Sequence, residues 1–141
     1  MSLNPIDFNI PEGFIHADGD PAEDYIGPFF YRMHDNGGIE SALRIETQHV
    51  NGLRMVHGGV LMAMADYTLG VAAIGREGRV CVTISCNQEF VSPAFKGNLL
   101  RGRGELIRKT SSLMFVRCTL LVHERIVMTA SGVFKEIQPR S

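Results

Sequence analysis

The sequence predicts an α+β fold in which one long central helix is wrapped by a curved antiparallel sheet of five to six strands. The chain has 141 residues, enough for one hydrophobic core and too few for two domains of ordinary size. Residues 58–74 form an almost wholly apolar stretch rich in Leu, Met and Ala, which favour helix. The four segments after it alternate apolar and polar residues and are joined by short turns, as in an antiparallel meander.

Residues 1–24 predict a loosely structured lead-in to the fold. They contain three prolines and several Asp, Glu and Gly residues, and they leave room for one short helical turn. We therefore expect a single domain over residues 25–141. Residues 25–32 predict a first short strand, and the turn signal HDNGG separates this strand from the next one.

Residues 39–50 predict a strand with one face toward solvent, because apolar side chains such as Leu43 and Ile45 alternate with charged and polar ones. The stretch 58–74 follows and is apolar on all sides. A helix that is hydrophobic all round is normally buried, so this stretch is the predicted core helix.

Four strands are predicted after the helix, at residues 79–91, 98–109, 112–122 and 125–137. In the first, the alternation predicts an apolar face of Val80, Val82, Ile84 and Cys86, and a polar face of Thr83, Ser85 and Asn87. The third predicts a continuous apolar face of Met114, Val116, Cys118, Leu120 and Val122. The fourth predicts another of Ile126, Met128, Ala130 and Phe134.

Composition excludes several classes of function. The net charge of −1 and the lack of a basic tract interleaved with aromatic residues argue against a nucleic-acid partner. Three cysteines without a CxxC pair indicate reduced thiols, with no zinc or other metal site and no disulfide framework. No secretory signal begins the sequence, and the stretch 58–74 is too short to span a membrane, so we expect a cytoplasmic protein with no membrane partner.

Asp66 is the one charged residue in the apolar stretch. Burying an ionised carboxylate without a partner is costly in free energy, so its presence needs a reason. A structural reason is that Asp66 hydrogen-bonds a neighbouring loop or lies at a hydrated edge of the helix. A functional reason is that it acts as a base or a nucleophile. Helical periodicity alone leaves both open.

A glycine pair, Gly58 and Gly59, opens the predicted helix. Without side chains there, the first N–H groups and the positive end of the helix dipole are accessible to an anion or a polarised carbonyl oxygen. The pair can equally serve only a tight turn into the helix, and His57 before it can be a purely structural histidine.

The spacing of these features restricts how they can cooperate. Asp66 lies eight residues after Gly58, or about 12 Å along one helix. A carboxylate and an N–H that act on the same carbonyl must both lie within about 4 Å of it. The functional interpretation therefore requires a two-fold dimer with antiparallel helices, which brings the N-terminus of one helix to the middle of its partner.

The motif N-x-x-x-x-x-H-G-G from Asn51 to Gly59, with Asp66 nine residues after His57, resembles that of the hotdog-fold acyl-CoA thioesterases. The likeness is greatest to the phenylacetyl-CoA thioesterase group and its 4-hydroxybenzoyl-CoA relatives. The segments GPFFYR, FVSPAFKGNLL and VMTASGVFKEI extend it over residues 25–137. The resemblance implies a hotdog fold and hydrolysis of acyl-CoA to a free acid and coenzyme A by homodimers that assemble into a tetramer.

The resemblance also implies roles for individual residues. The backbone N–H of Gly58 would polarise the thioester carbonyl, while Asp66 from the partner subunit would attack it or activate a water. Asn51 would position that water or the thioester, and Thr83 would support the water or carboxylate beside Asp66. The role of His57 would be mainly architectural, with its side chain fixing the turn.

Coenzyme A is part of the substrate, and no cofactor is expected. Gly59 would contribute to the substrate site, and the basic residues Arg108 and Lys109, with Thr110, would meet the phosphates of coenzyme A. A solvated hairpin turn is the alternative explanation for these three residues.

Other functions of the same fold remain as alternatives. The first is a non-catalytic acyl-CoA-binding protein. The second is a hydratase or dehydratase, which typically needs the pattern D-x-N-x-x-H, whereas this chain has His49 two residues before Asn51. Some relatives carry Glu at the position of Asp66 and Thr at the position of Gly70. Because Asp is shorter than Glu, two mechanisms stay open: Asp66 attacks the thioester carbonyl itself, or it acts as a general base that delivers water.

Overall fold

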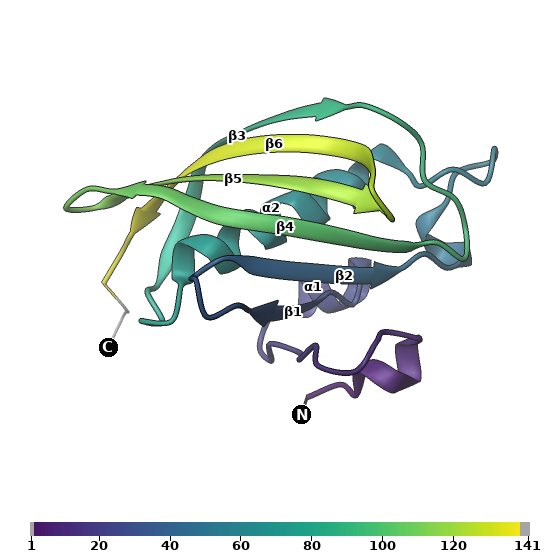
Figure 1. Ribbon diagram of the computed structural model, residues 1–141, viewed down its shortest axis with the longest axis horizontal. Coiled ribbons are helices and arrows are strands. Elements are labelled where there is room, and N and C mark those ends of the chain that lie inside the picture. Colours follow the sequence, from purple (N-terminus) through teal and green to yellow (C-terminus); the bar gives the residue numbers. More distant parts are fainter. Residues whose placement is uncertain (1, 139–141) are drawn as a thin grey trace.

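The computed structural model describes residues 2–138 and confirms the predicted α+β architecture (Figure 1). Its elements are η1 (Pro5–Phe8), α1 (Pro21–Ile26), β1 (Phe30–Met33), β2 (Ile39–Arg44), η2 (Thr47–His49), α2 (Gly58–Ile74), β3 (Cys81–Phe90), β4 (Leu99–Lys109), β5 (Leu113–Val122) and β6 (Arg125–Glu136). The strands form one antiparallel sheet in the order β1-β2-β4-β5-β6-β3. The sheet curves around α2, and the core lies between them.

Helix α2 has well-defined ends. The imidazole Nδ1 of His57 accepts a hydrogen bond from the N–H of Gly59 at 2.9 Å, which caps the first turn. Gly75 ends the helix with a φ of +62°, a conformation that favours glycine. Between these ends, Leu61, Met64 and Leu69 are buried in the core.

The prediction that α2 is buried on all sides was wrong for a single chain. One stripe along the helix stays open to solvent, and we call it the open stripe: Gly59, Met62, Ala63, Asp66, Gly70 and Ile74. Met62 is 48% exposed and Ile74 is 40% exposed, although both are large and apolar. A single chain therefore leaves apolar helix surface uncovered.

Strand β3 is a free edge of the sheet, and its predicted faces were partly wrong. The register against β6 shifts between Thr83 and Ser85, which marks a β-bulge. Thr83 consequently faces α2 together with Cys86, whereas Ser85 lies in a groove on the outer surface of the sheet. The large apolar side chains of this strand are poorly covered, and Ile84 is 57% exposed.

Strands β5 and β6 differ in how well the sequence predicted them. The predicted apolar face of β5 is confirmed, because its five members are all buried. On β6, Met128, Ala130 and Phe134 are buried as predicted, but Ile126 is exposed and Val127 is buried instead. A register shift against β5 at this point reverses the alternation.

Residues 2–20 cover the start of the sheet. Ile10 and Phe14 pack with Phe30 and Ala42 in a second small core. Ile15 exchanges two backbone hydrogen bonds with Tyr31 and so covers part of the β1 edge. The segment contains η1 and leads into α1, which is more helix than the single turn expected.

This packing corrects two strand predictions. Residues 25–32 begin inside α1, so the first strand starts only at Phe30. Residues 39–50 form a strand only as far as Arg44, and neither face of it is solvated. The N-terminal segment covers its outer face, while the imidazole of His49 accepts from the N–H of Glu46 and favours a 3₁₀ turn over a longer strand.

Candidate active site

Asp66 lies in the middle of α2 on the open stripe, partly exposed to solvent. Its Oδ1 accepts a hydrogen bond from the Thr83 hydroxyl at 2.8 Å. The bulge after Thr83 is the point where β3 turns this side chain toward the helix. Within residues 2–138, no Lys or Arg forms an ion pair with Asp66. The carboxylate is therefore oriented by a hydroxyl but is not neutralised by a cation, which suits a base or a nucleophile.

Gly58 is the first helical residue of α2, and its N–H has no acceptor within residues 2–138. The fold itself does not require glycine here. Its φ is not in the left-handed region, and an added Cβ would lie 3.4 Å from the Phe90 ring, an ordinary contact. Gly59 differs, because an added Cβ would lie 3.1 Å from the capping Nδ1 of His57. The free N–H of Gly58 is thus available to an external acceptor.

Asn51 and His57 shape the loop that enters α2. The Oδ1 of Asn51 accepts hydrogen bonds from the N–H groups of Leu53 at 2.9 Å and Met55 at 3.2 Å. This leaves only its side-chain amide N–H groups for a ligand. His57 caps the helix as described, and its backbone N–H donates to the carbonyl of His49. The observed contacts of His57 are those of an architectural residue.

The single chain brings these residues together in two separate groups. Asp66 meets Thr83 at the middle of α2, and Gly58, Gly59 and His57 gather at its N-terminus with the Asn51 loop. The eight residues between Gly58 and Asp66 keep the two groups on different turns of one helix.

The predicted phosphate-binding residues lie on the β4–β5 hairpin, and two of them are already engaged. Lys109 pairs with Glu136 at 3.2 Å and donates to the Thr110 carbonyl. The Thr110 hydroxyl accepts from the N–H of Leu113 and stabilises the turn. Of the three, Arg108 alone is an exposed cation without a partner in the part of the chain that the structure describes.

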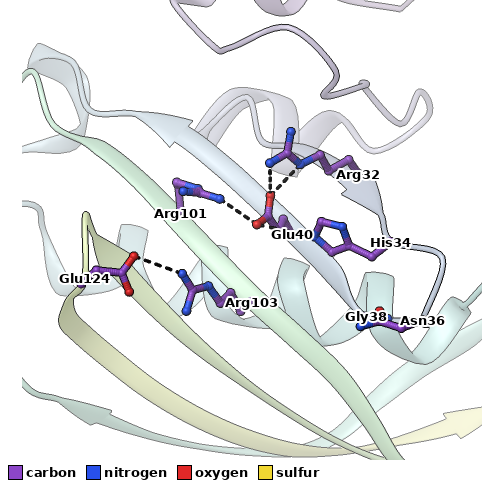
Figure 2. A network of polar contacts seen from close by, with 8 residues as sticks. All are labelled: Arg32, His34, Asn36, Gly38, Glu40, Arg101, Arg103 and Glu124. Carbon is purple, nitrogen blue, oxygen red and sulfur yellow. Dashed lines mark hydrogen bonds and ion pairs between the residues drawn. The ribbon is translucent and has the colours of Figure 1, made fainter.

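Arg101 belongs to a separate polar network on the outer side of the sheet, and Arg103 lies beside it, paired with Glu124 at 3.4 Å (Figure 2). The buried carboxylate of Glu40 is held by Arg32 at 2.6 Å and Arg101 at 2.7 Å, with His34 at 3.5 Å. Burial raises the pKa of Glu40, but the two guanidinium groups outweigh it and hold that pKa below its usual value. This network ties β1, β2 and β4 together and is not part of the Asp66 site.

Sequence reasoning missed the packing of α1 against α2, and with it the acidic surroundings of Glu23 on α1. Burial and then the charges of Asp20, Asp66 and Asp24 raise its pKa to about 7. The following residue of α2, Tyr67, is buried, and its hydroxyl has no hydrogen-bond partner among the described residues. The sequence pattern D-P-A-E predicts a helix N-cap, which is found at Asp20, but gives no sign that α1 packs against α2.

The remaining titratable residues add no further centre to the described chain. The three cysteines are free thiols, and burial raises the pKa of each. Residues 2–138 hold no group of His, Cys, Asp and Glu side chains arranged to bind a metal ion. None of the described helices has the length and hydropathy needed to cross a bilayer.

Comparison with known proteins identifies the family. The sequence profile of the thioesterase superfamily matches residues 53–128, which include Asp66, the glycine pair and Thr83. The chain belongs to the thioesterase superfamily. It is also 36% identical over 129 residues to a candidate esterase of Pseudomonas aeruginosa, with 89% of this chain and 96% of that protein covered. The resemblance to hotdog thioesterases seen in the sequence is thus confirmed.

Solved structures show the same fold. A candidate thioesterase of Ralstonia eutropha, described as related to phenylacetic acid degradation, is 30% identical, with a TM-score of 0.72 over 83% of this chain and 91% of that one. A hypothetical thioesterase of Streptococcus pneumoniae, solved with coenzyme A, is 20% identical, with a TM-score of 0.68 over 79% and 88% of the two chains. The family and these relatives support a hydrolase activity on thioesters.

Proposed function

We propose that this protein hydrolyses acyl-CoA thioesters to a free acid and coenzyme A, at sites shared between two subunits. The observation that carries the proposal is the Asp66 carboxylate, which lies on the open stripe of an apolar helix and is oriented by the Thr83 hydroxyl. The coenzyme A bound to the streptococcal thioesterase supports this choice of substrate.

Two uncovered surfaces support a two-fold dimer. The open stripe of α2 and the free edge of β3 are neighbours, because Thr83 on β3 bonds Asp66 on the stripe. The opposite edge of the sheet is partly covered by the pairing of Ile15 with Tyr31. A protein with one open edge forms a closed pair in preference to a chain of subunits. The small residues Gly59, Ala63 and Gly70 on the stripe allow a second helix to approach closely.

Antiparallel α2 helices in such a dimer unite the two half-sites. The Gly58 N–H of one subunit then polarises the thioester carbonyl, while Asp66 of the other subunit acts on the carbonyl carbon. As a general base, Asp66 takes a proton from water as the water adds to that carbon. The C–S bond then breaks and the proton passes to the leaving thiolate. As a nucleophile, Asp66 first forms a mixed anhydride, which water hydrolyses.

The other predicted residues support this chemistry. The free amide N–H groups of Asn51 orient the water or the thioester, and the cap from His57 to Gly59 keeps the helix N-terminus in place. Gly59 leaves room for the substrate beside the oxyanion donor. Arg108 is the residue of the β4–β5 hairpin that remains free to meet a phosphate of coenzyme A.

Release of free thiol from a panel of aryl, short-chain and medium-chain acyl-CoAs tests the proposed function. We expect turnover of at least one thioester well above its spontaneous hydrolysis. A protein that binds these thioesters, as measured by calorimetry, but releases no thiol would be a binding protein and would contradict the proposal.

The dimer is tested by the substitution Ile84→Lys. Ile84 is exposed on the β3 edge, so a lysine there leaves the single chain folded but places a desolvated charge in the subunit interface. We expect sedimentation velocity to show a monomer and thiol release to fall by about 100-fold or more, as expected when the oxyanion donor is lost. Ile6→Lys, at an exposed apolar residue of the N-terminal segment, is the matched control. A monomeric Ile84→Lys protein with full activity would refute the shared site.

A further inference from the structure

A cavity of about 550 Å³ lies between the end of α2 and strand β1. Its volume falls within the range of about 300–1,000 Å³ that is typical of small-molecule sites. Side chains from three parts of the chain form most of its walls: Val71 and Ile74 on α2, Tyr31 and Met33 on β1, and Ala17 in the segment before α1. These side chains give the cavity a largely apolar lining.

Arg76 is the charged residue in this lining, and its guanidinium group is already engaged. It donates to the carbonyl of His34 at 2.6 Å and lies 3.9 Å from the Asp35 carboxylate. The two remaining residues of the lining, Gly75 and Gly78, add no side chains. Since the cavity presents no unpaired charge from the described residues, an apolar group is the ligand that suits it.

The open stripe leads from Asp66 to this cavity. Asp66, Gly70 and Ile74 are spaced four residues apart, so they follow one another along the same face of α2. Ile74 belongs both to the open stripe and to the wall of the cavity. The eight residues from Asp66 to Ile74 cover about 12 Å along the helix axis. The cavity therefore lies within reach of a group that extends from Asp66.

Gly70 keeps the route along the helix free of a side chain. Packing within the subunit does not require glycine at this position. An added Cβ would lie 3.6 Å from the Phe134 ring, which is an ordinary contact, and the φ of Gly70 is not in the left-handed region. The space above Gly70 is thus available to a bound molecule.

The proposed dimer leaves this route open. Antiparallel helices that bring Gly58 of one subunit to Asp66 of the other overlap only between these two residues. Beyond Asp66, toward Ile74, the helix of the partner has already ended. The cavity is consequently not covered by that helix and can be entered from the position of the thioester carbonyl.

We propose that this cavity binds the far end of the acyl group and that the protein prefers straight-chain acyl groups of medium length. The inference rests on the proposed thioesterase function. With its carbonyl beside Asp66, the acyl chain passes over Gly70 and ends against Ile74. Three bonds of an extended chain span about 3.5 Å, so a chain of about ten carbons covers the distance of about 12 Å.

This geometry selects substrates by chain length. A short acyl group ends before the cavity and leaves its apolar walls unfilled. Each further methylene that moves from water into the cavity should raise kcat/KM by about fourfold. The gain ends when the chain fills the cavity, because additional methylenes then stay in water.

The experiment measures thiol release from hexanoyl-CoA, octanoyl-CoA and decanoyl-CoA, each below the concentration at which it forms micelles. The readout is the ratio of kcat/KM for decanoyl-CoA to that for hexanoyl-CoA. We expect a ratio of about 200 for the wild type, which corresponds to four added methylenes. Ile74→Trp should lower this ratio to about 10 or less, because the larger ring occupies the space that the chain needs.

The fold is expected to accept this substitution. Ile74 is the last residue of α2 and is 40% exposed, so the indole ring does not have to enter the core. A urea titration checks the stability of the variant. Ile6→Trp, at an exposed isoleucine of the N-terminal segment, is the matched control and should keep the ratio of the wild type.

The proposal on the cavity is overturned if the wild type hydrolyses the three compounds with equal kcat/KM, or if Ile74→Trp keeps the ratio of the wild type. Failure of the proposed function has a different result, in which the wild type releases thiol from none of the compounds. In that case the ratio of the dissociation constants of hexanoyl-CoA and decanoyl-CoA, measured by calorimetry for both proteins, tests the cavity in the same way.

Discussion

Asp66→Asn is expected to lower kcat/KM for thioester hydrolysis by about 1,000-fold while the protein stays folded. The amide keeps the size of the side chain and can still accept a hydrogen bond from Thr83, so the packing of α2 against β3 is preserved. It cannot take a proton from water, and it is a poor nucleophile. Thiol release measures the loss, and circular dichroism with a denaturant titration measures the fold.

An exposed aspartate provides the control for this substitution. Asp7→Asn lies in the N-terminal segment, away from α2, and should leave the rate unchanged. Equal turnover by the wild type and Asp66→Asn would show that the carboxylate is structural. The charge in the open stripe would then serve only to orient the subunit interface.

Gly58→Pro is expected to lower kcat by about 100-fold to 1,000-fold, because it removes the backbone N–H that polarises the thioester carbonyl in the proposed mechanism. The helix tolerates this change. Gly58 is the first helical residue, where proline is favoured, and its N–H has no acceptor within the described residues. His57 before it has a φ of −62° and a ψ of 136°, which suit a residue that precedes proline.

Gly58→Ala is the matched variant, since it keeps the N–H and adds one methyl group at ordinary distance from Phe90. We expect it to retain far more activity than Gly58→Pro. Similar losses in the two variants would mean that the space at residue 58 matters and that its N–H does not. Sedimentation velocity on both variants separates a loss of catalysis from a loss of the dimer.

The two variants together test whether the site is shared between subunits. A mixed dimer of one Asp66→Asn chain and one Gly58→Pro chain contains one complete site if Gly58 and Asp66 act across the interface. Co-expressed chains with different affinity tags should then yield dimers with about half of the wild-type rate. If each site lay within one chain, both sites of the mixed dimer would be defective and it would have almost no activity.

The fold was predictable from the sequence wherever local pattern and packing agree. The apolar stretch 58–74 became α2 with the same bounds, and the alternation in residues 112–122 placed the buried face of β5 correctly. Errors arose where a bulge reversed the alternation, at Thr83 on β3 and at Val127 on β6. A bulge adds one residue to one strand, and its position could not be predicted from the residue types on either side of it.

The burial of β2 was missed for a different reason. Its outer face carries Glu40, a charged residue that is normally solvated. The N-terminal segment, Arg32 and Arg101 cover and neutralise it, and these groups are remote from Glu40 in the sequence or lie on other strands. Only the tertiary structure could reveal that cover.

The sequence alone supplied the chemical groups of the proposed site: a carboxylate in an apolar helix, a glycine pair at its start and a hydroxyl on the following strand. Spacing along one helix was also enough to separate Gly58 from Asp66, which is why the proposed mechanism requires a second subunit. The tertiary structure decided which groups meet. It joined Thr83 to Asp66 through a bulge, left one stripe of α2 open beside a free sheet edge, and packed α1 against the same helix. Contacts of this kind depend on how distant segments pack, and packing is a property of the whole chain.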